Sequence, residues 1–153
     1  MTGPTITPHI VVRDAIAASE WYERALGAVE HGRLPLPNGK VMYVELWFGD
    51  SPVMVADEFP DLGILSPLAF GGTGVVLHIV TADVGTAWQR AVDAGAEVLS
   101  PLQDQFWGDR HGQLLDPFGH KWALAQHLRD VPQEEIAAAA AALLVPDGPR
   151  DAG

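Results

Sequence analysis

Two stretches of the chain repeat the same order of apolar and polar residues. Residues 9–14 read His-Ile-Val-Val-Arg-Asp, and residues 78–83 read His-Ile-Val-Thr-Ala-Asp. Each stretch is followed by a tryptophan within a helical pattern and then by a Gly-Ala pair at a nearly equal distance. Three matched features in the same order indicate that one structural unit occurs twice.

Each unit is expected to begin with a strand and continue as a helix. The β-branched residues at the start of each unit favour a pleated strand. Asp14 and Asp83 follow at the positions where a carboxylate can accept hydrogen bonds from the first free helix amides. Gly27 and Gly95 are suited to end the two helices in the left-handed conformation. The expected apolar stripes are Ile16, Trp21, Ala25 and Leu26 in the first helix and Val84, Ala87, Trp88, Ala91 and Val92 in the second.

After each helix, apolar residues recur at every second position, which is the period of a strand. We expect strands at 28–34, 40–48 and 53–57 in the first unit, and at 96–102, about 112–116 and 121–127 in the second. The Pro-Asn-Gly sequence at 37–39 favours a hairpin turn. The unit is therefore β-α-β-β-β, used twice, and the fold class is α+β.

These elements divide the chain into a first module (1–57), a linker rich in proline and glycine (58–73), a second module (74–128) and a C-terminal helix with its tail (129–153). Asp130 is expected to cap the C-terminal helix. A short helix alone is marginal in water, so we expect its apolar side chains to pack on the body or on a second subunit. These side chains are Ile136, Leu143 and Leu144.

Composition narrows the possible functions. The 153 residues are 48% hydrophobic and 19% charged, which favours a packed domain over disorder. Nine Lys and Arg against 20 Asp and Glu give a net charge of −11, which excludes nucleic-acid or anionic-membrane binding through a broad basic surface. The sequence contains no cysteine, no secretory signal pattern and no apolar stretch approaching about 20 residues. We therefore expect a cytoplasmic protein without disulfide or thiolate chemistry.

The motifs of the two units resemble the vicinal oxygen chelate superfamily, which includes glyoxalases, bleomycin-resistance proteins and extradiol dioxygenases. The resemblance rests on residues 7–14 and 20–28 in the first module, and on 107–110 and 116–122 in the second, where it is similar to the PhnB-like branch. It covers residues 5 to about 128. It implies two tandem βαβββ modules that form a cup-shaped mixed sheet with the helices on the convex side. It also implies a homodimer and a cup that holds either a metal with its substrate or a bulky ligand.

Strand alternation predicts which side chains face this cup. On the first strand of each module, Ile10, Val12, Leu77 and Ile79 are expected against the helices, and Thr7, His9, Val11, Val76, His78 and Val80 in the cup. On the third strand, Met42, Val44, Leu46 and Phe48 are expected on the apolar, helix-facing side, and Tyr43, Glu45 and Trp47 on the opposite face. On the last strand, Trp122 and Leu124 are expected to pack outward and Ala123 and Ala125 to line the cavity.

Two interpretations of the histidines remain open. His9, Glu45 and His78 form a donor set typical of zinc, manganese, iron or nickel sites, where a metal stabilises an enediolate as a Lewis acid. Alternatively, both imidazoles are neutral pocket residues and Glu45 pairs with a basic residue such as Arg110. The resemblance favours the second interpretation, because the four positions that usually supply metal ligands hold other residue types. These positions are Thr7, Met54, Val76 and Ala123.

Trp107 and Arg110 are expected at the rim of the cup. They offer a stacking platform and a forked hydrogen-bond donor to a ligand. Alternatively, Trp107 seals the core and Arg110 pairs with Asp109 or Asp116. Tyr43 and Trp47 are likewise expected either to contact a ligand or to lie in a dimer interface. His120 and Trp122 are expected to be structural. His31, His111 and His127 are expected at the surface, and the sequence indicates no partner for them.

The function we favour is a glyoxalase/bleomycin-resistance-like protein that binds a small organic molecule in the cup without the usual four metal ligands or another cofactor. The expected ligand-binding residues are His9, Tyr43, Glu45, Trp47, His78, Trp107 and Arg110. The alternatives are a metal-dependent lyase, isomerase or dioxygenase using His9, Glu45 and His78, and a non-catalytic dimeric interaction module.

Overall fold

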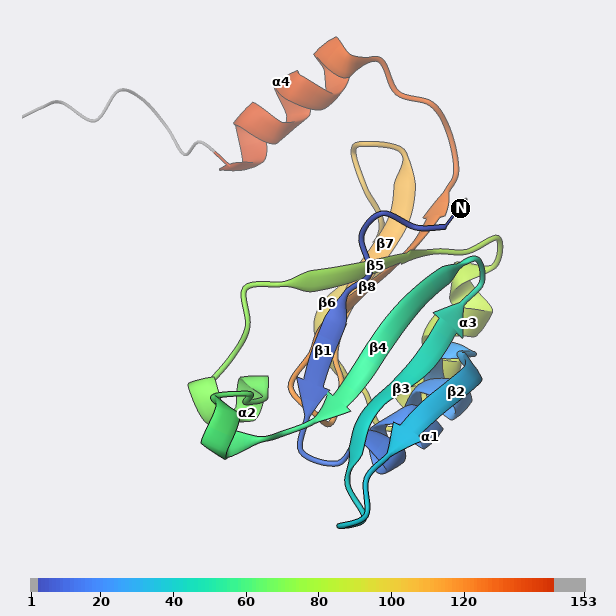
Figure 1. The fold of residues 1–153 in the computed structure, drawn as a ribbon. Helices are drawn as coiled ribbons and strands as arrows, with labels where there is room; N and C mark the ends of the chain where they lie inside the picture. The colour runs from blue at the N-terminus through green and yellow to red at the C-terminus, as the bar shows by residue number, and fades with distance from the viewer. Residues whose placement is uncertain (1–2, 145–153) are drawn as a thin grey trace, which may run out of the picture.

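The computed structural model describes residues 3–144 and contains two four-stranded sheets, one from each module (Figure 1). The first sheet has the order β1-β4-β3-β2 and the second the order β5-β8-β7-β6. In each module the first and last strands are parallel and the other neighbours antiparallel. The first module contains β1 (His9–Val12), α1 (Ala15–Leu26), β2 (Val29–Pro35), β3 (Val41–Phe48) and β4 (Ser51–Asp57). The second contains β5 (Val76–Val80), α3 (Val84–Asp93), β6 (Glu97–Asp104), β7 (Asp109–Leu115) and β8 (Lys121–His127). The predicted α+β fold of two βαβββ modules is confirmed.

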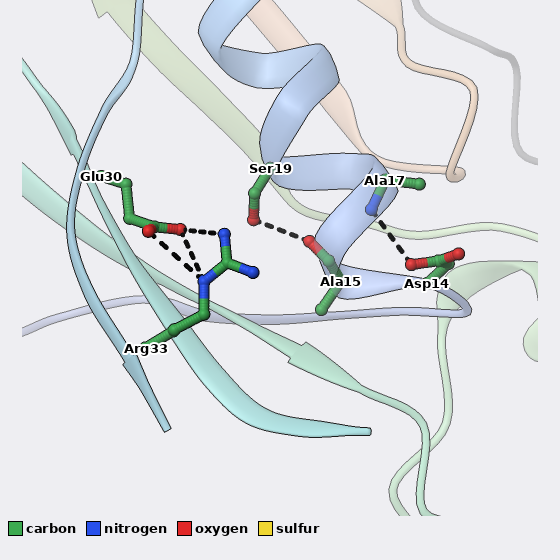
Figure 2. Close-up of polar contacts among 6 residues, drawn as sticks. All are labelled: Asp14, Ala15, Ala17, Ser19, Glu30 and Arg33. Atoms are coloured by element: carbon green, nitrogen blue, oxygen red, sulfur yellow. Dashed lines mark hydrogen bonds and ion pairs between the residues drawn. The ribbon is translucent and has the colours of Figure 1, made fainter. Parts of the chain in front are cut away.

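The N-termini of α1 and α3 and the C-terminus of α1 form as the sequence predicts. The Asp14 carboxylate accepts a hydrogen bond from the amide of Ala17 at 3.0 Å (Figure 2), and the Asp83 carboxylate accepts one from the amide of Thr86 at 3.2 Å. Gly27 ends α1 in the left-handed conformation with φ of 73°. The end of α3 differs slightly, because Ala94 closes it in the right-handed conformation and Gly95 follows with φ of 103°.

The helix-facing sides of both sheets share one core. Tyr22 of α1 lies 5.3 Å from Trp122 of β8 between ring centroids, and Trp122 lies 5.1 Å from Phe48 of β3. The Trp21 indole donates a hydrogen bond to the Ala94 carbonyl at the end of α3, 2.8 Å away. Because both sheets use their helix-facing sides for this core, the opposite side of each sheet, here called its outer face, lies outside it.

The predicted alternation holds on β1, where Ile10 and Val12 are buried in this core. It fails at one point on β3. Pro35 pairs with Val41 whereas Leu34 pairs with Tyr43, so the ladder carries an irregularity of one residue. Val41 is therefore buried, and Met42, predicted to face the helix, is 55% exposed.

The segments outside the two sheets are also ordered. The linker contains a 3₁₀ turn, η1 (Pro60–Leu62), and one helical turn, α2 (Pro67–Phe70). The C-terminal helix α4 (Gln133–Leu144) has no buried residue and projects away from the sheets (Figure 1). Its packing on the body, one of the two predicted options, is therefore not observed, and residues 145–153 fall outside the described part. Within residues 3–144, no helix is both long and apolar enough to cross a membrane.

Candidate functional site

A cavity of about 520 Å³ lies on the outer face of the first sheet. We call it the apolar groove; it is lined by His9, Val11, Leu36, Met42, Tyr43, Ala56, Phe59, Leu62 and Ile64. The sheet provides its floor through β1, β3 and β4, and the linker after β4 provides one wall. His9 and Tyr43, both predicted to face the cup, contribute an imidazole and a phenol to a lining that is otherwise apolar.

Further along β3, Trp47 stacks on His31 of β2. The ring centroids are 4.9 Å apart and the planes differ by 18°. The Trp47 Nε1 atom is buried and has no hydrogen-bond partner among residues 3–144. Glu45 lies two residues before Trp47 and is half-buried. Val44 and Leu46 are buried, so Glu45 and Trp47 lie on the opposite face, as strand alternation predicts. His31 is exposed, as predicted for a surface residue, and its stacking on Trp47 is a contact that the sequence did not indicate.

The outer face of the second sheet carries a different cluster. His78 of β5 and His111 of β7 stack with centroids 5.7 Å apart, and Trp107 meets His111 edge to face at 5.3 Å. Burial, and secondly the nearby His78, lower the pKa of His111 below its usual value. His111 is therefore favoured as the neutral imidazole near pH 7. It is half-buried and not the surface residue that was predicted, and its stacking partners were not evident from the sequence.

Trp107 lies in the turn before β7 and Arg110 is the second residue of β7, and both have partners within the protein. The Trp107 indole donates to Asp109 at 3.2 Å. Arg110 pairs with Asp104 at 2.7 Å, and not with Asp109, Asp116 or Glu45, the three partners predicted as alternatives. This ion pair is exposed, so it contributes little stability and leaves the guanidinium accessible.

His127 extends this chain of contacts toward α4. Its Nδ1 lies 3.0 Å from Asp109 and its Nε2 lies 2.7 Å from Asp130. Hydrogen bonds to these two carboxylates raise the pKa of His127. Asp130 therefore binds His127, whereas α4, which it was predicted to cap, begins at Gln133.

The metal hypothesis required His9, Glu45 and His78 to meet. His9 lies opposite Met54 and Met54 opposite Glu45, so β4 separates the imidazole from the carboxylate. His78 belongs to the other sheet, opposite Ala123. Across residues 3–144, no group of three His, Cys, Asp or Glu side chains is arranged to hold a metal ion. The donors of one chain therefore do not fit the divalent metal used by some members of the superfamily.

Sequence reasoning missed the linker side chains of the groove and the two histidine stacks. Phe59, Leu62 and Ile64 stand in a Pro- and Gly-rich segment without periodicity, so no pattern placed them at a site. His31 lies within the predicted strand 28–34, and His111 directly precedes the strand predicted at about 112–116. The contacts of His31 with Trp47 and of His111 with His78 depend on the strand register, which the irregularities in each sheet determine.

Comparison with known proteins supports the fold and the family. Residues 5–124 match the Glyoxalase/Bleomycin resistance protein/Dioxygenase superfamily. An uncharacterized protein of Mycobacterium tuberculosis, Rv0887c, is 44% identical over 139 residues, covering 89% of this chain and 82% of the relative. The uncharacterized Arabidopsis thaliana protein At5g48480 is 31% identical over 122 residues, covering 75% of this chain and 71% of the relative.

Solved structures give the same result. TioX from Micromonospora sp. ML1 superposes with a TM-score of 0.65 at 27% identity, covering 82% of this chain and all 100% of TioX. The crystal structure of the Arabidopsis protein superposes with a TM-score of 0.64 at 29% identity, covering 81% of this chain and 99% of the other. With two βαβββ modules, their paired motifs and a match over residues 5–124, the chain belongs to the glyoxalase/bleomycin resistance protein/dioxygenase superfamily.

Proposed function

We propose that this protein binds a small organic molecule in the apolar groove, without the four metal ligands usual in the superfamily. The observation that carries the proposal is the groove itself. Its volume of about 520 Å³ is that of a small-molecule site, and its lining is apolar with two polar groups, His9 and Tyr43. The positions of the usual metal ligands carry Thr7, Met54, Val76 and Ala123, none of which is a histidine or carboxylate.

Thermal unfolding with and without compounds tests this function. A ligand at 100 times its Kd stabilises the folded protein by about 2.7 kcal/mol, which raises the melting temperature measurably. We expect His9→Ala and Tyr43→Ala to weaken the shift, and His127→Ala, which lies outside the groove, to preserve it. Trp107→Ala reports separately on the second sheet. If no compound of a broad library shifts the melting temperature of the unsubstituted protein, the proposal fails.

We infer that the protein functions as a homodimer. The outer faces of both sheets lie outside the shared core, and apolar side chains stand exposed on β5 and β6. Examples are Val76, Val80, Val98 and Leu99. A second copy could cover these apolar side chains. Light scattering should then give twice the 16.4 kDa mass of one chain, and a single 16.4 kDa species would contradict the inference.

We also propose membership of the PhnB-like branch and a cytoplasmic location. The branch is supported by the motifs at 107–110 and 116–122, which form the turns that place Trp107 and the buried Asp116. The location is supported by the absence of cysteine. Fractionation of cells producing the tagged protein tests the location.

A further inference from the structure

The linker between the modules builds one wall of the apolar groove. Phe59 and Ile64 form an antiparallel bridge, with Phe59 N donating to Ile64 O at 2.8 Å and Ile64 N donating to Phe59 O at 3.1 Å. Between them, η1 ends at Gly63, whose φ of 72° allows the sharp return. The segment Phe59–Ile64, here called the linker loop, is thus closed on itself, and it presents Phe59, Leu62 and Ile64 to the groove.

The linker loop is also fixed to the body at its base. Lys40 Nζ donates to the Glu58 carbonyl at 2.7 Å and lies 5.0 Å from the centre of the Phe59 ring. The Glu58 carboxylate accepts a hydrogen bond from the Ser66 amide at 2.8 Å, and Arg13 lies 3.8 Å from it. These contacts hold both ends of the loop, so the wall has a defined position over the sheet.

The second module, residues 74–128, has no wall that corresponds to the linker loop. The register matches His9 and Val11, opposite Met54 and Ala56, with His78 and Val80, opposite Ala123 and Ala125. After β8, however, the chain turns toward Gly108, whose carbonyl accepts hydrogen bonds from the amides of Leu128 and Arg129. Val80 is left 70% exposed. The wall that closes the groove therefore comes from the linker, whereas the sheet that forms its floor occurs in both modules.

The lining determines which molecules can bind. It contains no Asp, Glu, Lys or Arg side chain, and His9 and Tyr43 provide its side-chain hydrogen-bonding groups. Moving an ion from water into such surroundings is costly unless a partner charge compensates it. Leu62 remains 75% exposed and Met42 55% exposed at the rim, so apolar surface is available for a ligand to cover.

We propose that the linker loop is the specificity-determining wall of a site for an uncharged, largely apolar molecule, with one hydrogen-bonding group directed at His9 and Tyr43. This proposal rests on the proposed function and assigns the class of its ligand. Leu62, Phe59 and Ile64 select the apolar part of the molecule, and the absence of a charged lining side chain selects against anions.

Calorimetric titration with two probes of matched shape tests the proposal. We expect 2-naphthol, which is neutral at pH 7, to bind at least tenfold more tightly than 2-naphthoate, which is an anion. We expect Leu62→Asp to weaken 2-naphthol binding at least tenfold, because it places a carboxylate at the apolar wall. Leu62 is highly exposed, so this change leaves the fold intact. Leu144→Asp is the matched control, since Leu144 is also 75% exposed but lies at the end of α4, and it should bind 2-naphthol normally.

The other outcomes separate this proposal from the proposed function. If 2-naphthoate binds as tightly as 2-naphthol, or if 2-naphthol does not bind, the assigned ligand class is wrong, and the compound library then decides whether the protein binds small molecules at all. If Leu62→Asp binds 2-naphthol normally while Trp107→Ala does not, the site lies on the second sheet. If Leu62→Asp changes the oligomeric state and leaves 2-naphthol affinity unchanged, the groove is a protein interface. The first result overturns the assigned ligand class, and each of the other two overturns the role of the linker loop.

Discussion

The Asp116 carboxylate is buried and organises the joint between the two modules. It accepts hydrogen bonds from the Tyr22 hydroxyl at 2.5 Å and the Trp122 indole at 2.8 Å, and from the amides of Phe118 and His120 at 2.8 and 3.0 Å. Burial, and secondly the Asp116 charge, raise the pKa of Tyr22 well above its usual value. One side chain from the second module thereby satisfies donors of both modules.

Removing this acceptor should destabilise the protein strongly. We expect Asp116→Ala to lower the free energy of unfolding by about 3–5 kcal/mol, because several buried donors lose their partner together. Tyr22→Phe should cost only about 1–2 kcal/mol, since Asp116 keeps its other donors. Urea denaturation measures both, and the exposed Asp104→Asn should stay within about 0.5 kcal/mol. Because the raised pKa means that the folded state holds the Tyr22 proton more tightly, the contribution of Tyr22 to stability should be fully present below pH 10 and should decline as the pH rises above it.

The histidines give a second prediction at this scale. Asp109 and Asp130 raise the pKa of His127, whereas burial and His78 lower that of His111. The contribution of His127 to stability is therefore present at acid pH and is lost as the pH rises through its raised pKa. An NMR titration should place His127 above and His111 below the ordinary value of 6.5. Asp130→Asn should lower the His127 pKa and leave that of His111 unchanged; a shift of both would mean that the contacts are not separate.

At the scale of elements, Gly112 of β7 lies directly against the Trp88 side chain of α3. A Cβ atom at this position would lie 2.5 Å from the Trp88 ring and 3.0 Å from Leu102 Cα. We expect Gly112→Ala to cost about 1–3 kcal/mol, because the core would have to move to admit the methyl group. Thermal or urea denaturation provides the measurement. Gly32→Ala in β2 is the control, since a Cβ atom added there would have no other atom within 4 Å; equal losses at both sites would refute the packing argument.

The elements also show what a sequence can predict. The caps Asp14 and Asp83, the order of strands and helix along each module and the burial of Ile10 and Val12 follow from local chemistry and period, and these could be predicted. Met42 was misplaced because a one-residue irregularity between β2 and β3 exchanges the faces beyond it. The groove was predicted only on its sheet side, because a loop wall such as Leu62 depends on a bridge and a turn that have no period.

At the scale of the whole molecule, the two modules are repeats in sequence but one unit in packing. Tyr22 and Phe48 of the first module surround Trp122 of the second, and Trp21 donates its indole proton to Ala94 across the boundary. A module alone would expose these aromatic faces to water and leave the Asp116 carboxylate without the Tyr22 hydroxyl. The chain is therefore built from two copies of one unit, and both copies depend on the shared core for their stability.

This arrangement predicts that neither module folds independently. The fragment 74–144 should lack a cooperative unfolding transition in circular dichroism, because a domain of this size is marginal even with a complete core and this one would lack half of its aromatic cluster. The full chain should unfold in one transition that coincides for tryptophan fluorescence and far-ultraviolet signals. Adding the fragment 1–73 should restore structure to 74–144 if the lost contacts are the cause. A cooperative transition in the isolated fragment would instead show that the second sheet and α3 are sufficient, and that the aromatic contacts between modules add little.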